Sequence, residues 1–277
     1  DMGGTSTDVS HYAGSYERYS ETRVAGTRIR APMMRIHTVA AGGGSICSFD
    51  GVRFQVGPES AGAVPGPACY RRGGPLAVTD CNLLLGKLQP NHFPHVFGES
   101  GKEPLDLEAV RGKFADLVAE VQEKTGRSYS PEEAAEGFLT IAVANMANAI
   151  KTISLQRGHD VTRAVLAGFG GAGGQHVCLV ADALGIETVM CHPLASVLSA
   201  YGMGLADRRV LREATLATPL DEAHFREIGE AVTRYGEEAQ TELAEQCADG
   251  AELRQEAALF LRPQGSESTI EVPFGPL

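Results

Sequence analysis

The sequence predicts an α/β fold in which at least two strands run parallel. An apolar run at 164–167 is typical of a buried strand, and a glycine-rich turn follows it at once. Residues 175–184 then have a helical pattern that stops at Gly185, and 186–190 predicts a second strand. Such a strand–helix–strand unit implies parallel strands. Two amphipathic stretches between residues 106 and 158 predict long helices that pack beside this unit.

The chain opens on a turn of glycines and hydroxyl side chains, Asp1-Met2-Gly3-Gly4-Thr5-Ser6-Thr7-Asp8. Glycine lets a backbone approach a ligand closely, and hydroxyl groups can donate to anionic oxygens. An acid beside a phosphate site is typical of a divalent cation held through water. The composition therefore predicts a loop that holds the terminal phosphates of a nucleotide and their Mg²⁺. The alternative is a Gly-Gly-Thr turn that closes a β-hairpin, with acids at its ends.

Residues 9–60 lack helical periodicity and predict short strands and turns, for example at 27–30 and 35–39. A run of three glycines follows at 42–44. It is either a flexible surface turn or a place where the backbone approaches a ligand.

Four prolines and several glycines fall within residues 57–82. Such a stretch cannot continue a helix or a central strand, so it predicts an extended loop. Long loops inside compact domains are often functional. Its polar candidates are Glu59, Ser60 and Asp80, and they serve either in function or as caps of turns.

Two helices are predicted next. Asp106 can cap a helix that has apolar residues on one face and ends at Gly126. The sequence Ser130-Pro131-Glu132-Glu133 is a capping box that opens a second helix, which Gly158 ends.

The turn after the strand at 164–167 is the second candidate ligand site. Its members are Gly170, Gly171, Gly173, Gly174 and Gln175. A strand, a glycine turn and a helix N-terminus together let backbone N–H groups face a ligand. Both this turn and the opening turn are expected to follow the C-termini of strands, which predicts them at the same edge of the fold. The spacing matches neither the dinucleotide fingerprint nor the P-loop.

His176 begins the helix and either touches the nucleotide or satisfies the helix terminus. Just upstream, His159 and Asp160 could form a catalytic pair, but a structural role is favoured because adjacent residues on a turn seldom aim together.

The last part of the chain predicts a separate packing unit. Residues 195–207 are rich in small side chains. A long amphipathic helix is predicted over 225–243, and paired strands are predicted at 257–261 and 268–272.

The composition is that of a globular protein. The chain has 277 residues, of which 43% are hydrophobic and 21% charged. No apolar run approaches the ~20 residues of a membrane span. A net charge of −11 without a basic patch argues against nucleic-acid binding. The six cysteines include no Cys-x-x-Cys pair, which predicts buried, reduced thiols in a cytoplasmic protein rather than a cysteine-bound zinc site.

Several blocks together resemble the hydantoinase A and 5-oxoprolinase family. They are Asp-Met-Gly-Gly-Thr-Ser-Thr-Asp-Val at 1–9 and Phe-Gly-Gly-Ala-Gly-Gly-Gln-His at 169–176, with further blocks at 38–45, 57–63, 65–70, 78–80 and 157–160. The resemblance runs in order over nearly the whole chain. It implies an N-terminally truncated, actin-like ATPase lobe of the ribonuclease-H-like type over 1–213, with a mixed sheet and packed helices. It also implies the start of a truncated C-terminal domain over 214–277, and it places the glycines at 42–44 near the site.

The resemblance implies ATP-dependent opening of a cyclic amide, with conversion of 5-oxo-L-proline to L-glutamate as the first expectation. The stretch 261–267 resembles an oxoprolinase pattern but departs from it at Pro263, Ser266 and Glu267. An N-methylhydantoinase and an acetone carboxylase-type subunit therefore stay open. A non-enzymatic actin-like nucleotide-binding module and a sugar kinase of the same fold are the alternatives of other classes.

The same resemblance implies ATP and Mg²⁺ as cofactors. Asp1 and Asp8 would be the catalytic carboxylates, and Asp1 would hold the metal. Phosphate donors would come from Gly3, Gly4, Thr5, Ser6 and Thr7, and the adenosine would lie against Gly170, Gly171, Gly173, Gly174 and Gln175. Expected partners are a lactam or hydantoin substrate, a hydantoinase B-type domain or subunit, and further copies in a homo-oligomer. Neither nucleic acid nor membrane is expected, and the isolated chain is expected to be inactive.

Overall fold

The computed structural model describes residues 1–277 except 25, 156–157, 248–249, 267–268 and 276–277. The chain divides into two compact units, Asp1–Met203 and Gly204–Leu277. The domain boundary predicted at 213/214 stays a prediction, ten residues beyond this division.

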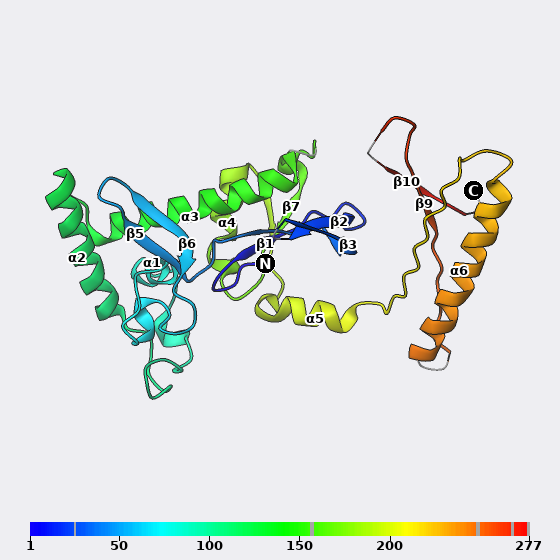
Figure 1. Ribbon diagram of the computed structural model, residues 1–277. Helices are drawn as coiled ribbons and strands as arrows, with labels where there is room; N and C mark the ends of the chain where they lie inside the picture. The colour runs from blue at the N-terminus through cyan, green and yellow to red at the C-terminus, as the bar shows by residue number, and fades with distance from the viewer. Residues whose placement is uncertain (25, 156–157, 248–249, 267–268, 276–277) are drawn as a thin grey trace. The chain divides into compact units, whose positions relative to one another are not determined.

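Short antiparallel strand pairs make up the first part of the first unit, as predicted for residues 9–60 (Figure 1). The pairs are β1 (Thr7–Val9) with β4 (His37–Val39), β2 (Arg18–Val24) with β3 (Thr27–Met34), and β5 (Ser45–Phe49) with β6 (Phe54–Ser60). In the β1–β4 pair Thr7 lies opposite Val39 and Asp8 opposite Thr38. The residues before Thr7 form the opening turn, which leads into β1.

The two predicted long helices are confirmed as α2 (Leu107–Thr125) and α3 (Pro131–Ile153). Asp106 caps α2 by accepting a hydrogen bond from the backbone N–H of Ala109 at 3.0 Å, and Gly126 ends it in the left-handed region. At the start of α3 the side chains of Ser130 and Glu133 form the predicted capping box.

The predicted end of α3 at Gly158 is wrong. The helix stops at Ile153, and Ser154 closes its last turn: the backbone N–H and the hydroxyl of Ser154 both donate to the carbonyl of Ile150, at 3.1 and 2.6 Å. Gly158 lies in the turn that follows, where it has a φ of +80°.

The prediction of one extended loop over 57–82 is also wrong at both ends. Strand β6 runs through Pro58 to Ser60, which the sheet tolerates because β6 pairs on one side only. The helix α1 (Val78–Leu84) begins inside the stretch. It starts there because the carboxylate of Asp80 accepts a hydrogen bond from the backbone N–H of Ala77 at 2.8 Å.

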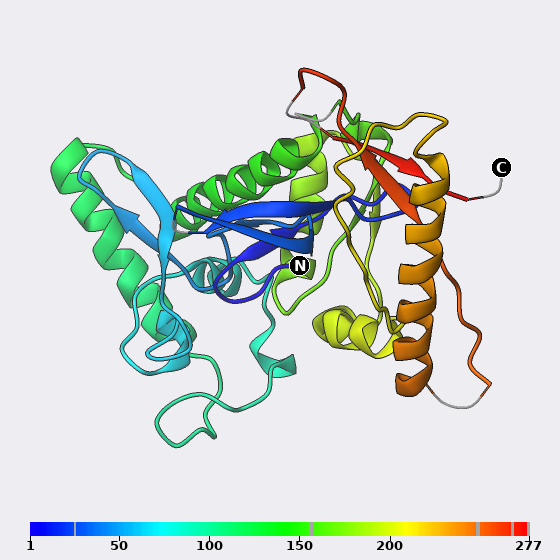
Figure 2. The ribbon, with the colours of Figure 1, turned by 45° about the vertical axis from the view of Figure 1, so that its right-hand side comes forward.

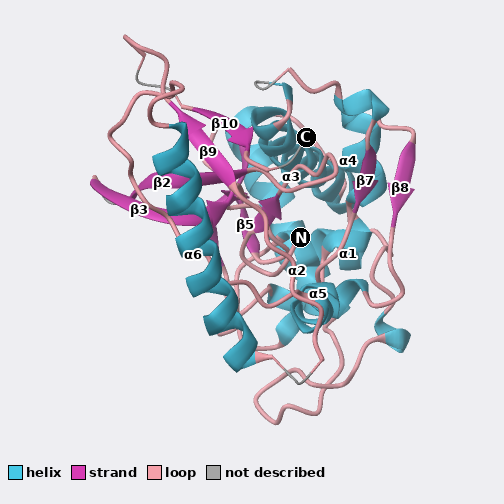
Figure 3. Cartoon of the chain, turned by 90° about the vertical axis from the view of Figure 1, so that its right-hand side faces the viewer, coloured by secondary structure: helices cyan, strands magenta, loops and turns pink. Residues whose placement is uncertain are grey.

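The predicted strand–helix–strand unit is confirmed. β7 (Val165–Ala167) and β8 (Thr188–Met190) pair in parallel, and α4 (Val177–Leu184) connects them (Figure 3). Gly185 ends α4 with a φ of +69°, a conformation that favours glycine. The 3₁₀ turn Gly173–Gln175 lies between β7 and α4.

Helix α3 forms the centre of the core of the first unit, and α1, α2, α4 and β6 pack around it (Figure 2). The ring of Phe138 on α3 lies 4.6 Å from Phe54 and 6.4 Å from Phe114, measured between ring centroids. Phe114 and Phe138 are fully buried. Burial of aromatic side chains of this size is a large part of the stability of such a core.

The second unit contains α6 (Phe225–Gln246) and the antiparallel pair β9 (Ala258–Leu261) and β10 (Ile270–Pro273), as predicted. Helix α5 (Leu198–Leu205) was not predicted, and it crosses the division between the units. Within the described residues, no helix is both long and apolar enough to cross a membrane.

The prediction that all cysteines are buried is only partly correct. Cys47, Cys69 and Cys81 are buried, whereas Cys178 and Cys191 are exposed. Cys178 lies on α4, and Cys191 comes just after β8.

Candidate functional site

The opening turn is the tip of a β-hairpin. Met2 pairs with Thr7 in an antiparallel bridge, and the backbone N–H of Gly3 donates to the carbonyl of Ser6 at 3.0 Å. Gly4 and Thr5 are exposed at the tip. The β-hairpin given above as the alternative prediction is therefore present, and the backbone at its tip is exposed.

The two glycine turns meet, as predicted. The N–H of Met2 donates to the carbonyl of Phe169 at 2.9 Å, and the N–H of Ala172 donates to the carbonyl of Met2 at 3.0 Å. Gly170 has a φ of +86°, and a side chain there would collide with Met2 and with the carboxylate of Asp1. Glycine at 170 is thus required both by backbone conformation and by close approach.

The backbone of the glycines at 42–44 is hydrogen-bonded to the backbone of the opening turn. The N–H of Gly43 donates to the carbonyl of Gly3 at 3.0 Å, and Gly44 donates to Gly4 at 2.6 Å. All three glycines are buried. The interpretation as a flexible surface turn is wrong, because these groups are packed against the backbone of the opening turn.

The predicted catalytic carboxylates each have one hydroxyl partner. The hydroxyl of Ser199, on α5, donates to Oδ2 of Asp1 at 2.7 Å. The hydroxyl of Thr38, on β4, donates to Oδ1 of Asp8 at 2.5 Å. Both acids are half-buried. Sequence reasoning missed Ser199 because it lies 198 residues from its partner.

The three predicted phosphate donors that carry hydroxyl groups, Thr5, Ser6 and Thr7, differ in exposure. Thr7 is buried and its hydroxyl donates to the carbonyl of Ala41. Ser6 is half-buried and Thr5 is exposed. The exposed tip of the turn therefore offers Thr5 and the backbone, while the hydroxyl of Thr7 anchors the hairpin.

The glycines of the second turn differ in exposure. Gly171 and Gly174 are exposed, and a Cβ atom at either would meet nothing within 4 Å, whereas Gly173 is buried. The side-chain oxygen of Gln175 accepts a hydrogen bond from Nδ2 of Asn82 at 2.7 Å, so this amide reaches toward α1.

His176 and Asn82 form a buried polar contact behind this turn. Nε2 of His176 lies 3.0 Å from Nδ2 of Asn82, and the two side chains are 1% and 0% exposed. Among the described residues, neither Oδ1 of Asn82 nor Nδ1 of His176 has a hydrogen-bond partner. This contact links α1 to the start of α4.

We expect this histidine to make the fold sensitive to acid. Burial, and to a smaller degree the charge of Lys87, lowers the pKa of His176 from 6.5 to about 4. Between these values the unfolded chain binds more protons, so this contribution to stability is complete above pH ~6.5 and is lost toward pH ~4. Urea unfolding of the parent and of His176→Gln at pH 7 and pH 5 tests this. The parent should lose more stability than the variant, and equal losses would contradict the expectation.

Asp80 has a structural role. It is fully buried, and its carboxylate accepts hydrogen bonds from the backbone N–H groups of Ala68, Cys69 and Ala77 at 2.8–3.0 Å. Burial raises the pKa of Asp80, and the three backbone donors oppose that shift. Of the other two polar candidates in this stretch, Glu59 is exposed and Ser60 is half-buried. Asp80 caps turns, which was the alternative predicted for it.

His159 and Asp160 do not act as a pair. Asp160 accepts hydrogen bonds from the N–H and the hydroxyl of Thr162 at 3.1 and 2.7 Å, whereas Nε2 of His159 lies 3.4 Å from Glu17. The favoured structural role of Asp160 agrees with this geometry.

The residues present suit Mg²⁺. The ion prefers oxygen ligands, and one or two carboxylates with substrate phosphates usually hold it. The half-buried carboxylate of Asp1 lies where the two turns meet, and Asp8 is the middle residue of β1, which follows the opening turn. Asp1 would hold the ion, and the phosphates of a bound nucleotide would supply further oxygen ligands.

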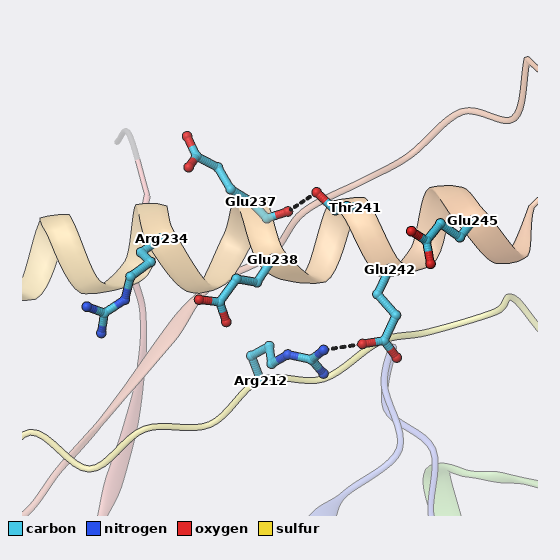
Figure 4. Close-up of a pocket in the computed structure, with 7 residues that line it drawn as sticks. All are labelled: Arg212, Arg234, Glu237, Glu238, Thr241, Glu242 and Glu245. Atoms are coloured by element: carbon cyan, nitrogen blue, oxygen red, sulfur yellow. Dashed lines mark hydrogen bonds and ion pairs between the residues drawn. The ribbon is translucent and has the colours of Figure 1, made fainter.

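A hollow in the second unit contains none of the predicted site residues (Figure 4). It lies along α6, and its lining consists of Arg212, Arg234, Glu237, Glu238, Thr241, Glu242 and Glu245. Arg212 forms an ion pair with Glu242, and the hydroxyl of Thr241 donates to the carbonyl of Glu237 at 2.8 Å. These contacts are those of a solvated helix face rather than of a ligand site.

We expect Gly171→Val to weaken nucleotide binding about tenfold with little change in melting temperature. Gly171 is exposed and its φ is not positive, so the fold tolerates a side chain, which would occupy the space above the turn. The comparison variant Gly170→Ala should lower both quantities. Nucleotide titration and thermal unfolding of the full-length protein measure the two effects. Unchanged affinity in Gly171→Val would make the turn purely structural.

Comparison with known proteins gives matches that include the residues of both glycine turns. The family model described as hydantoinase/oxoprolinase matches residues 1–212. The chain is 43% identical over 278 residues to 5-oxoprolinase 1 of Arabidopsis thaliana, covering 98% of this chain and 22% of that protein. It is 51% identical over 208 residues to 5-oxoprolinase of Saccharomyces cerevisiae, covering 75% of this chain and 16% of that protein.

A solved structure has the same fold. The ATP-dependent caprolactamase from Pseudomonas jessenii superposes with a TM-score of 0.77 at 31% identity, covering 99% of this chain and 39% of that one. This similarity confirms the predicted α/β fold. The chain spans about a fifth of the length of the two 5-oxoprolinases. The match over residues 1–212, which includes both glycine turns and Asp1, shows that the chain belongs to the hydantoinase/oxoprolinase family.

Proposed function

We propose that this chain is the phosphate-binding part of an enzyme that opens a cyclic amide at the expense of ATP, with 5-oxo-L-proline to L-glutamate as the first candidate reaction. The observation that carries the proposal is the meeting of the two glycine turns beside the carboxylate of Asp1. The relatives named 5-oxoprolinase and the structure of an ATP-dependent caprolactamase support it.

The proposed chemistry follows from the weakness of a lactam as an electrophile. Transfer of the terminal phosphoryl group of ATP to its carbonyl oxygen, with ADP as the leaving group, makes the carbonyl carbon a better electrophile. Water would then add to that carbon, and the ring C–N bond would break with the nitrogen leaving as the amine. A second water would release inorganic phosphate from the resulting acyl phosphate. Catalysis of phosphoryl transfer consists mainly of positioning and charge neutralisation. Bound Mg²⁺ would supply positive charge beside the phosphate oxygens.

The residues of this chain supply the positioning. The exposed backbone at Gly4 and Thr5 can donate to the terminal phosphates. Gly171 and Gly174 leave an open surface on the adjoining turn, where the adenosine would lie. Ser199 holds the carboxylate of Asp1 in one orientation. Gly43 and Gly44 fix the hairpin from behind, so the donors are set before the nucleotide arrives.

Further parts of the proposal concern partners and location. Hydrolysis of the activated amide would be completed in a hydantoinase B-type domain or subunit. We also propose a homo-oligomer located in the cytoplasm. One relative is the alpha subunit of caprolactamase of Pseudomonas jessenii, and its being a subunit supports an enzyme of more than one part.

Lactam-dependent release of phosphate from ATP tests the proposal. The full-length protein should release phosphate faster when 5-oxo-L-proline is added than without it, with hydantoin and caprolactam as comparison substrates. Stimulation by one of these instead would keep the reaction class and change the substrate. Nucleotide binding with no response to any cyclic amide would favour a non-enzymatic module and would overturn the proposal.

A further inference from the structure

Two histidines and a glutamate converge away from the glycine turns. They are His11, just after β1, Glu17, just before β2, and His159, in the turn between α3 and β7. One ligand atom from each residue lies within 4.8 Å of the other two. All three side chains are half-buried. The three residues come from two segments that are far apart in sequence.

The contacts within this cluster orient the three side chains toward one another. The rings of His11 and His159 stack with centroids 4.1 Å apart and an interplanar angle of 23°. Nε2 of His159 lies 3.4 Å from Oε1 of Glu17. The other oxygen of Glu17, Oε2, lies 3.5 Å from the guanidinium of Arg35, whose backbone N–H also donates to the Glu17 carbonyl at 2.9 Å.

This donor set suits a divalent transition ion. Imidazole nitrogens bind such ions in their neutral form, and two histidines with one glutamate make an established set for Zn²⁺ with an open fourth position. Ligand atoms about 2.1 Å from a tetrahedral ion lie about 3.4 Å apart. The ligand atoms of the cluster would have to approach one another by at most about 1.4 Å, which side-chain rotations of half-buried residues can provide.

We propose that His11, Glu17 and His159 form a binding site for a divalent transition ion, Zn²⁺ in the first instance, with water as the fourth ligand. The ion ties the segment after β1 to the turn that leads toward β7. The opening glycine turn leads into β1 and the second glycine turn follows β7, so the ion acts as a structural clip between the strands next to the two turns. The site shares no residue with the carboxylates assigned to the nucleotide site, and the inference does not depend on the enzyme activity proposed above.

Zinc binding to the full-length, tag-free protein tests this inference. Cys178, Cys191 and Cys247, which are exposed or half-buried, are first replaced by serine, because accessible thiols also bind zinc. Equilibrium dialysis against Zn²⁺ with metal analysis, and thermal unfolding with and without Zn²⁺, give the two readouts. We compare this background with His11→Ala, His159→Ala and Glu17→Gln, and with His95→Ala, an exposed histidine outside the cluster, as the matched control.

We expect the background and His95→Ala to share one zinc site that each cluster variant loses, with binding weakened at least tenfold. Loss of a second-shell partner alone typically costs ten- to a hundredfold in metal affinity, so the loss of a ligand should cost at least as much. Zinc should raise the melting temperature of the background and of His95→Ala but not of His11→Ala. Each variant is compared with itself without metal, so a change in basal stability does not obscure the result. Equal zinc binding by background and cluster variants would overturn the inference, as would no zinc binding by the background.

Discussion

Replacing Asp1 by asparagine should lower lactam-dependent ATP hydrolysis by the full-length enzyme roughly a hundredfold or more. The change keeps the shape of the side chain and its contact with Ser199 but removes the negative charge beside the two turns. A loss of ~3 kcal/mol of transition-state charge stabilisation corresponds to that factor. Nucleotide binding should fall only modestly, because the backbone donors of both turns remain.

Phosphate release at saturating ATP and Mg²⁺ measures this effect, and nucleotide titration measures binding separately. Asp50→Asn is the matched control, since Asp50 is an exposed acid in the turn between β5 and β6. Ser199→Ala should lower turnover about tenfold, because it releases one oxygen of Asp1 from its fixed orientation. Near-parent turnover in Asp1→Asn would remove this carboxylate from the mechanism and leave the opening turn as a structural hairpin.

The second large effect is expected at Asp80, on stability rather than on turnover. Asp80→Ala would leave the buried N–H groups of Ala68, Cys69 and Ala77 without their acceptor. Each unsatisfied buried donor costs about 1–3 kcal/mol, so the free energy of unfolding should fall by roughly 3 kcal/mol or more. The first turn of α1 would lose the carboxylate that caps it. Thr79, in that turn, donates a hydrogen bond to the carbonyl of Gly43 at 2.8 Å, so this contact should weaken as well.

Urea unfolding of the parent and the variant measures this difference. Asp160→Ala is the control, because Asp160 is a helix cap that accepts comparable hydrogen bonds at an exposed site. Loss of such a cap typically costs about 1 kcal/mol. If Asp80→Ala were no more destabilising than Asp160→Ala, the buried carboxylate would not organise this part of the chain.

The parts of the fold that local chemistry determines were predictable from the sequence. Helix α2 begins at Asp106 and ends at Gly126 because the cap and the left-handed turn are properties of those residues themselves. The capping box at Ser130 and the turn at Gly185 are similar cases. The meeting of the two glycine turns was also predictable, because both were expected at the same edge of the fold.

The parts that depend on distant contacts were not predictable. Helix α1 lies in a stretch of prolines and glycines, and it forms because Asp80 gathers backbone N–H groups from the preceding loop. Asn82 meets His176 across 94 residues. Neither contact leaves a local pattern in the sequence, so both the buried network and the serine that holds Asp1 had to be found in the structure.

The way the opening hairpin is held has a consequence for the order of folding. Its backbone is hydrogen-bonded to Gly43 and Gly44 on one side and to Phe169 and Ala172 on the other. Contacts between residues so far apart in sequence close large loops, and such contacts slow folding. The hairpin can therefore reach its final geometry only after the strand–helix–strand unit has docked. In a refolding experiment, recovery of nucleotide affinity should lag behind recovery of helical signal, so that ligand binding reports the last step of assembly.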